Sequence, residues 1–320
     1  MRSLTGELRR PDSPIRRFFV AEFPRTAYLA EAVERQLRAS PPLLPPPGAE
    51  PVPWSTLGTA IDYRLRYAFQ VRPTHRLDAF RGAQYLTSNW PGPCATVPLP
   101  RTPGSNVAVS VGLPRVVQEF FRALDALLAR VRPARRRLDP PAEAALCRAC
   151  YLLALLEQVL RNPTHTAASP LRRLGSAATL DDLLALVEPA WVEDLCRLSR
   201  RFADRCATLL GQPAVVGPRA GAIGGFGAAA DLLVGGCLLD IKTTIRPVFD
   251  PHWLSQVLGY VLLDARYPRR IGGVGFYFPR QGVLLRWGLA ALLPRLTGDP
   301  DVRLDDLQER FRRLVSQLPM

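Results

Sequence analysis

The spacing of apolar residues predicts mostly helices in the first two thirds of the chain. An amphipathic pattern over 25–38 predicts a first helix, and a second is expected from Ser55 or Thr56, either as N-cap, to about Phe69. The proline-rich stretch 40–53 cannot be helix or central strand and predicts a stiff connector. Further helices are expected over 115–131, 141–161, 179–188 and 190–210.

The pattern changes after residue 211. Short apolar runs rich in glycine and valine predict strands within 211–248, followed by a helix over 252–265. Gly273–Phe278 and Val283–Trp287 then predict a hairpin. A polar amphipathic helix is expected over 301–317, whereas the second proline- and glycine-rich stretch, 90–104, predicts a loop.

A predicted hairpin brings two aspartates together. Gly235-Gly236 separates two apolar runs and suits a two-residue turn, so paired residues sum to 471 and Asp231 faces Asp240. Directly opposed side chains share one face of the sheet, with Cβ atoms about 4.5–5.5 Å apart. Lys242 lies two residues beyond Asp240, on the same face of the strand.

Two carboxylates at one point favour Mg²⁺ or Mn²⁺, and the backbone carbonyl of Ile241 is a plausible further ligand. The alternative is that the aspartates are solvated carboxylates on an edge strand, because an Asp-x-Lys triplet is common by chance.

Composition makes the lysine conspicuous. The chain has 42 basic and 28 acidic residues among 320, a formal charge of +14, and Lys242 is its single lysine beside 41 arginines. A coding bias toward arginine explains most of this, but lysine and arginine differ chemically. The charge suggests a polyanionic partner such as nucleic acid. No apolar run is long enough for a transmembrane helix or a signal peptide, so we expect a cytoplasmic protein with six free thiols.

Asp231…Asp240-Ile-Lys242 resembles the metal-binding signature of the PD-(D/E)XK nuclease superfamily, and the surrounding sequence is most similar to its RecB-like branch. That branch carries a Q-x-x-x-Y motif on the next helix, which Gln256 and Tyr260 match on one helix face. The resemblance implies an α/β (α+β) fold, with a restriction-endonuclease-like mixed sheet flanked by helices. It also implies that Gln256 and Tyr260 contact the DNA strand near the metal.

The sequence departs from the branch at its G-x-x-x-H motif. Gly58 is followed four residues later by Asp62 instead of histidine. An aspartate can also ligate Mg²⁺, so Asp62 is a tentative metal ligand, with a solvated helix carboxylate as the alternative. Glu193 is a weaker candidate for the role of the missing histidine as metal ligand. Some nucleases of the RecB-like branch hold an iron–sulfur cluster through cysteines that follow the Q-x-x-x-Y helix. No cysteine follows Cys237 here, so we expect no such cluster. A zinc site using Cys147 and Cys150 is a further alternative.

These observations predict an N-terminal helix and connector over 1–50 and a nuclease-like domain over 51–300. Within that domain a helical insertion is expected at about 71–205 and the catalytic sheet at about 211–290, and a C-terminal helix follows at 301–320.

The predicted function is Mg²⁺-dependent hydrolysis of DNA, single- or double-stranded, with Asp231, Asp240 and Lys242 as catalytic residues. Arginines near the proposed site are predicted phosphate contacts: Arg64, Arg66, Arg246, Arg280 and Arg286. One alternative is a catalytically silent nuclease-like module that binds nucleic acid or a partner protein. Another is a basic helical scaffold in which the hairpin carboxylates are incidental.

Overall fold

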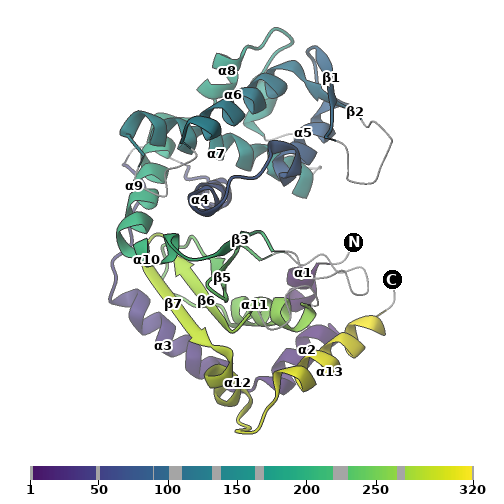
Figure 1. Cartoon of the computed structure of the whole chain (residues 1–320), viewed down its shortest axis with the longest axis vertical. Helices are drawn as coiled ribbons and strands as arrows, with labels where there is room; N and C mark the ends of the chain where they lie inside the picture. The colour runs from purple at the N-terminus through teal and green to yellow at the C-terminus, as the bar shows by residue number, and fades with distance from the viewer. Residues whose placement is uncertain are drawn as a thin grey trace. The chain divides into compact units, whose positions relative to one another are not determined.

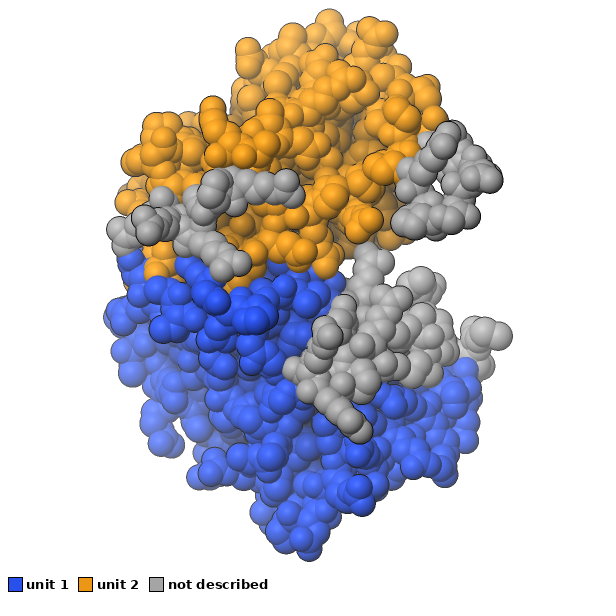
Figure 2. Space-filling model, in the orientation of Figure 1, with its two compact units in different colours: residues 1–43, 204–320 blue, residues 44–203 orange. Residues whose placement is uncertain are grey.

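The chain forms two compact units in the computed structural model (Figure 2). Unit 1 combines Met1–Leu43 with Asp204–Met320, and unit 2 is Leu44–Ala203. The structure describes residues 3–47, 51–88, 90–100, 110–131, 138–162, 169–218, 230–264 and 271–318. Helices and two sheets make up these residues, so the predicted mixed α and β class is confirmed.

Unit 1 is built on a five-stranded mixed sheet. The strands follow one another across it in the order β3-β4-β5-β6-β7. Every neighbouring pair is antiparallel except β5 and β6, which are parallel and are linked by helix α11 (Figure 1). The bounds are Ala214–Val216 (β3), Leu232–Val234 (β4), Cys237–Ile241 (β5), Pro251–Leu263 (α11), Gly273–Phe278 (β6) and Val283–Gly288 (β7). The predicted mixed sheet and its final hairpin are therefore confirmed.

The hairpin between β4 and β5 has the predicted register. Gly235 and Gly236 have φ angles of 54° and 77°, as a two-residue turn of the type that matches strand twist requires. Val234 pairs with Cys237, and the ladder ends two pairs later at Leu232 and Leu239. Asp231 lies one residue outside β4, and its backbone carbonyl accepts a hydrogen bond of 2.8 Å from the N–H of Gly217.

Helices from both ends of the chain complete the core of unit 1. They are Leu4–Arg9 (α1), Pro14–Glu22 (α2), Thr26–Arg38 (α3), Leu289–Thr297 (α12) and Leu304–Ser316 (α13). Phe19 of α2 and Phe311 of α13 are both buried, with ring centroids 5.4 Å apart. The predicted division at residues 50 and 300 thus differs from the structure, because both terminal segments share their apolar core with the sheet.

Of these helices, the sequence predicted α3 and α13 but missed α1, α2 and α12. Helix α1 has only six residues, too few for a periodic pattern to be read. Helix α12 contains Pro294, which sequence rules place outside helices.

Unit 2 consists mainly of helices, with one two-stranded antiparallel sheet. The helices are Trp54–Phe69 (α4), Asp78–Thr87 (α5), Arg115–Val131 (α6), Pro140–Arg161 (α7), Leu180–Ala185 (α8) and Pro189–Arg205 (α9). A further short helix, Ala207–Leu210 (α10), follows in unit 1. This region differs from its predicted structure in three details.

The first correction concerns the predicted loop 90–104, which contains strand Cys94–Pro98 (β1), paired with Ser110–Pro114 (β2). Residues 101–104 of that loop lie outside the described residues. The second is that the predicted helix 190–210 is two helices, with Cys206 between them. The third is that Ser55 and Thr56 both lie inside α4, whose N-cap is Pro53, and Thr56 accepts a hydrogen bond from Gln158 at 2.8 Å.

Helix α4 also changes the expected domain division. The prediction placed the helix beginning near Ser55 with the catalytic sheet and started the insertion at about residue 71. In the structure α4 belongs to unit 2, together with the helices of the predicted insertion. Its buried residues, including Leu57 and Ile61, pack against α7 in that unit.

Gly82 allows α5 and α7 to pack closely. A Cβ atom at Gly82 would lie 1.8 Å from the carbonyl oxygen of Leu156, and this backbone atom cannot rotate away. We therefore expect Gly82→Ala to destabilise the protein by about 2 kcal/mol or more, despite alanine's higher helix propensity. Calorimetry of the full chain measures the effect. Gly175→Ala is the matched control, since a Cβ there meets nothing within 4 Å. An equal melting temperature for both variants would contradict the prediction.

Candidate active site

Asp240 and Lys242 form an ion pair at the end of the central strand β5. Asp240 is buried, at 3% exposure, and its Oδ2 lies 2.7 Å from Nζ of Lys242. Alternation along the strand places both side chains on one face, as predicted. The backbone N–H of Lys242 donates to the carbonyl of Tyr277 on β6 at 2.9 Å, which continues the parallel pairing. The sheet therefore holds the lysine backbone beside the buried carboxylate.

Asp231 contacts the same strand through its side chain. Its Oδ2 accepts a hydrogen bond of 2.7 Å from the backbone N–H of Ile241. The carboxylate thus binds an N–H of β5 just beyond the last recorded pair of the β4–β5 ladder. The prediction placed Asp231 opposite Asp240 as the next ladder pair. The structure brings both aspartates to this end of β5. Asp231 is held there by the hydrogen bond from the backbone N–H of Ile241.

Gln256 and Tyr260 lie on one face of α11 and extend the polar contacts of Lys242. Nζ of Lys242 donates to Oε1 of Gln256 at 3.3 Å, and Nε2 of Gln256 donates to the Tyr260 hydroxyl at 2.6 Å. Helix α11 begins at Pro251 because Asp250 caps it, accepting a hydrogen bond from the backbone N–H of His252. The structure therefore joins four predicted residues in one chain of contacts: Asp240, Lys242, Gln256 and Tyr260.

The charges of both aspartates reach Tyr260. Burial raises the pKa of the Tyr260 hydroxyl, and the negative charges of Asp240 and Asp231 raise it further, against an opposing hydrogen bond from Gln256. The phenol consequently keeps its proton at neutral pH. Since two separate carboxylates act on one hydroxyl, Asp231, Asp240 and Tyr260 belong to one electrostatic cluster, which we call the β5–α11 site together with Lys242 and Gln256.

Two contacts of the β5–α11 site were not predicted. Nζ of Lys242 lies 5.5 Å from the ring centroid of Trp253, a cation–π arrangement. Trp253 precedes Gln256 by three residues, and this helical spacing was the available sequence signal. Thr5 of α1 lies close enough to the Tyr260 hydroxyl to oppose the rise of its pKa. The sequence carried no signal for this contact, because helix α1 was itself not predicted.

Asp62, the tentative metal ligand, lies on α4 in unit 2, whereas Asp231 and Asp240 lie in unit 1. Its Oδ1 accepts a hydrogen bond of 2.7 Å from Nε of Arg66, one turn away on the same helix. Asp62 and Arg66 thus form an ion pair with each other within α4. The weaker substitute, Glu193, lies exposed on α9 of unit 2.

Two of the arginines predicted to contact phosphate are buried and bind groups of the protein. Arg64 is buried and donates through Nε and Nη2 to the two carboxylate oxygens of Glu143, at 2.7 and 2.6 Å. Arg280 is fully buried, and its Nη1 donates to the carbonyl of Leu43 at 3.1 Å. Both guanidinium groups thus stabilise the interior. Arg246 and Arg286 are exposed, so phosphate contact by these two stays a prediction.

The described residues contain no group of three or more His, Cys, Asp or Glu side chains arranged to hold a metal ion. Cys147 and Cys150, the alternative zinc ligands, are buried on α7 as free thiols. The donors of the β5–α11 site are two carboxylates, the hydroxyl of Tyr260 and the carbonyl of Ile241. Hard oxygen donors of this kind suit Mg²⁺ or Mn²⁺ better than softer metals.

Comparison with known proteins identifies no relative of the chain. No family model, curated protein or solved structure matches the chain. Within the described residues, no helix combines the length and apolar character needed to cross a membrane. The residues of the β5–α11 site therefore remain the only indication of what the chain does.

Proposed function

We propose that the chain is a metal-dependent deoxyribonuclease with a restriction-endonuclease-like core of the PD-(D/E)XK type, RecB-like branch. The observation that carries the proposal is the chain of contacts from Asp240 through Lys242 and Gln256 to Tyr260. The residues of two separate sequence motifs meet there, and they include the single lysine among 42 basic residues. A chance Asp-x-Lys triplet would not require the Gln and Tyr of the next helix to lie beside it.

Asp231, Asp240 and the carbonyl of Ile241 would hold Mg²⁺ or Mn²⁺. Both carboxylates act electrostatically on Tyr260, so their charges converge, and oxygen donors fit a hard cation. When bound, the ion would polarise the scissile phosphate and lower the pKa of an attacking water. The hydrogen bond from the Ile241 N–H fixes one oxygen of Asp231 and thereby orients that carboxylate.

Lys242 would act on the phosphate directly. Its ammonium lies between Asp240, Gln256 and the face of Trp253, and the Lys242 side chain is only 17% exposed. A positive charge in this sheltered position stabilises the negative charge that develops on the phosphate oxygens as the bond to water forms. Lysine is also able to release and regain a proton at Nζ, whereas arginine stays protonated.

Gln256 and Tyr260 would position the DNA strand. The Tyr260 hydroxyl keeps its proton because burial and two carboxylates raise its pKa, so it remains a donor to a phosphate oxygen. Arg246 follows β5 closely and is exposed, which suits a sequence-independent phosphate contact. The substrate class is therefore DNA, single- or double-stranded.

We expect Asp240→Asn and Asp231→Asn each to lower Mg²⁺-dependent cleavage of labelled DNA by about 100-fold or more. Outer-shell partners of metal sites already contribute about 10- to 100-fold in affinity, and a direct ligand contributes at least as much. Asparagine at 231 can still accept the N–H of Ile241, so the fold should persist. Titration with Mn²⁺, followed by electron paramagnetic resonance, measures metal binding independently of activity.

Asp299→Asn is the matched control, because Asp299 is exposed and accepts a backbone N–H from Asp301 at 2.9 Å. It should cleave like the wild type. Cleavage that survives both Asp231→Asn and Asp240→Asn, or that persists in excess chelator, would refute the catalytic assignment.

The second candidate is a catalytically silent nuclease-like module that binds nucleic acid or a partner protein. It is favoured by one observation: Asp62, at the position of the branch's histidine, is engaged by Arg66 within its own helix. Wild-type chain that binds labelled DNA with Mg²⁺ present but leaves it intact would support this candidate. Chain that neither binds nor cleaves DNA would favour the helical scaffold.

A further inference from the structure

The ring of Trp253 forms one side of the place that Lys242 occupies. Nζ of Lys242 lies over the ring face, 5.5 Å from its centroid, while Asp240 and Gln256 contact the same nitrogen at 2.7 and 3.3 Å. A cation over an indole face is attracted by the negative π surface of the ring, and the attraction grows as water is excluded. Because the lysine side chain is mostly buried, Trp253 contributes to holding the ammonium as well as to packing.

Aromatic neighbours fix the ring of Trp253 itself. The ring of Phe249 lies 5.7 Å from it at 89°, and the ring of Phe278 lies 6.3 Å from it at 49°. Both phenylalanines are buried, and the backbone N–H of Phe249 donates to the Glu34 carboxylate at 3.0 Å. Packed aromatic pairs prefer defined angles, so a turn of the indole would disturb this group. Lys242 therefore lies against a rigid surface.

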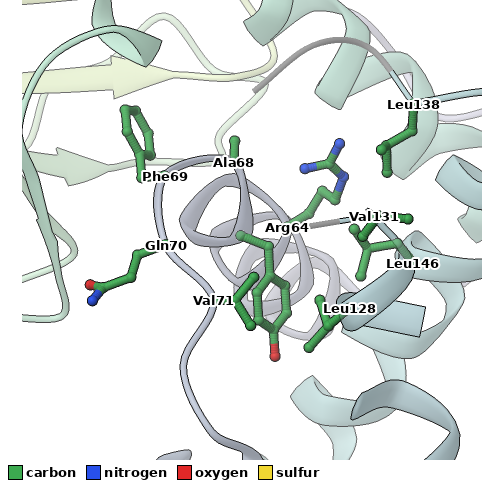
Figure 3. Close-up of a pocket in the computed structure, with 10 residues that line it drawn as sticks. Arg64, Ala68, Phe69, Gln70, Val71, Leu128, Val131, Leu138 and Leu146 are labelled. Carbon is green, nitrogen blue, oxygen red and sulfur yellow. The ribbon is translucent and has the colours of Figure 1, made fainter. Parts of the chain in front are cut away.

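The buried arginine of unit 2 shows why an ammonium needs such a surface. Arg64 extends toward Leu138 (Figure 3), and its Nε and Nη2 bind the two carboxylate oxygens of Glu143 at 2.7 and 2.6 Å. Two parallel hydrogen bonds fix the direction of a planar guanidinium. An ammonium on a flexible stem is a point charge, and Lys242 meets a single carboxylate oxygen, Oδ2 of Asp240. Its direction therefore depends on the further contacts around it.

We propose that Trp253 is a positioning residue for Lys242. Its indole face confines the ammonium to one side, beside Asp240 and Gln256, where the charge is directed at the phosphate of a bound DNA strand. The inference rests on the proposed nuclease function, in which Lys242 stabilises the charge that develops on the phosphate oxygens. Trp253 acts through the lysine and has no contact with the substrate. An aliphatic residue at position 253 would fill part of the space without attracting the cation.

The single lysine of the chain allows a direct test by NMR. Labelling of the full chain with ¹³C-lysine gives one set of side-chain signals, those of Lys242, in a ¹H–¹³C spectrum recorded without metal or DNA. Protons over an aromatic face resonate upfield, so we expect the Hε signal of the folded chain to lie upfield of its position in urea. This shift should disappear in Trp253→Leu and remain in large part in Trp253→Phe, which keeps an aromatic face. An Hε signal that Trp253→Leu leaves unchanged would overturn the proposal.

Cleavage kinetics test the consequence for the reaction. Trp253→Leu should lower kcat for Mg²⁺-dependent cleavage of labelled DNA by about tenfold and leave KM within about twofold, because the contact acts on the lysine and not on DNA binding. Trp253→Phe should recover most of the rate. Trp287→Leu is the matched control, since it removes another indole of unit 1, whose ring packs 6.3 Å from that of Phe276. It should cleave like the wild type.

The two measurements separate this inference from the proposed function. Equal kcat for Trp253→Leu and the wild type, or equal losses in Trp253→Leu and Trp287→Leu, would overturn the positioning role and leave the nuclease intact. A wild-type chain that cleaves no DNA would instead refute the nuclease, and with it the catalytic consequence of the contact, even where the Hε shift confirms the contact itself. If Trp253→Leu does not fold, Trp253→Met replaces it in both measurements.

Discussion

Exchange of Lys242 for arginine is expected to lower Mg²⁺-dependent DNA cleavage by about 100-fold or more, although it leaves the formal charge at +14. Nζ of Lys242 lies 2.7 Å from Asp240 and 3.3 Å from Gln256, over the face of the Trp253 ring. Arginine would bring a larger planar group into a position sized for an ammonium. Its pKa also prevents it from giving up a proton in the reaction.

The measurement compares initial cleavage rates of wild type and Lys242→Arg on the same labelled DNA, with melting temperatures recorded in parallel. Arg303→Lys is the control, because it makes the reverse exchange at an exposed position of unit 1. It should cleave at the wild-type rate. A folded Lys242→Arg variant with nearly wild-type activity would show that any cation serves at this position, and the specific role of lysine would be wrong.

The largest expected loss of stability follows from Arg64→Met. Removal of the guanidinium leaves Glu143 buried in unit 2 without its positive partner, and such a change costs about 3–5 kcal/mol. The double variant Arg64→Met/Glu143→Gln removes both charges, so it should be more stable than Arg64→Met alone. This outcome would assign the loss to the isolated carboxylate and exclude a simple packing defect.

Calorimetry of the full chain gives the change in melting temperature, and amide hydrogen exchange locates it. Faster exchange is expected in α4 and α7, which carry the two partners, with little change in α11 of unit 1. The surface control is Arg313→Met, since Arg313 and Glu309 form an exposed pair, which is worth about 0–1 kcal/mol. Equal losses for Arg64→Met and Arg313→Met would contradict the prediction.

The same ion pair predicts a pH dependence. Burial alone would raise the pKa of the Glu143 carboxyl, but the hydrogen bonds and charge of Arg64 outweigh it and hold the pKa below its usual value. A lowered pKa in the folded state stabilises the protein at pH values above the unfolded pKa of about 4.3. This contribution is lost as the pH falls through the folded-state pKa.

Acid titration of the melting temperature tests this linkage. The decline of the wild type below about pH 4.3 should be shallower in the double variant Arg64→Met/Glu143→Gln, which has no carboxyl at position 143. Identical acid profiles for the wild type and the double variant would mean that Glu143 does not contribute to the acid sensitivity.

Several parts of the fold were predictable because short-range rules set them. The turn at Gly235-Gly236 determines the hairpin register by residue counting, and the structure has that register from Val234–Cys237 to Leu232–Leu239. The helix expected over 115–131 has the same bounds in the structure, since a regular apolar stripe covers its whole length. Gln256 and Tyr260 share a face because residues four apart on a helix always do.

Sequence rules failed where a residue's partner lies far along the chain. Arg64 was assigned to DNA from its type and neighbourhood, but its partner Glu143 is 79 residues away in sequence. Arg280 is bound to the backbone of Leu43, 237 residues away. Neither pairing leaves a pattern in the local sequence. From sequence alone, an arginine that stabilises the interior therefore looks the same as one that contacts phosphate.

At the β5–α11 site, local sequence was enough to place Asp240 with Lys242 on one strand face and Gln256 with Tyr260 on one helix face. The packing of α11 against β5, which brings Lys242 to Gln256 and over the ring of Trp253, and the place of Thr5 near Tyr260 could be seen only in the folded chain. It also decided that Asp62 pairs with Arg66 in unit 2. The reason is physical: backbone geometry repeats within an element, whereas contacts between elements depend on burying apolar surface from the whole chain.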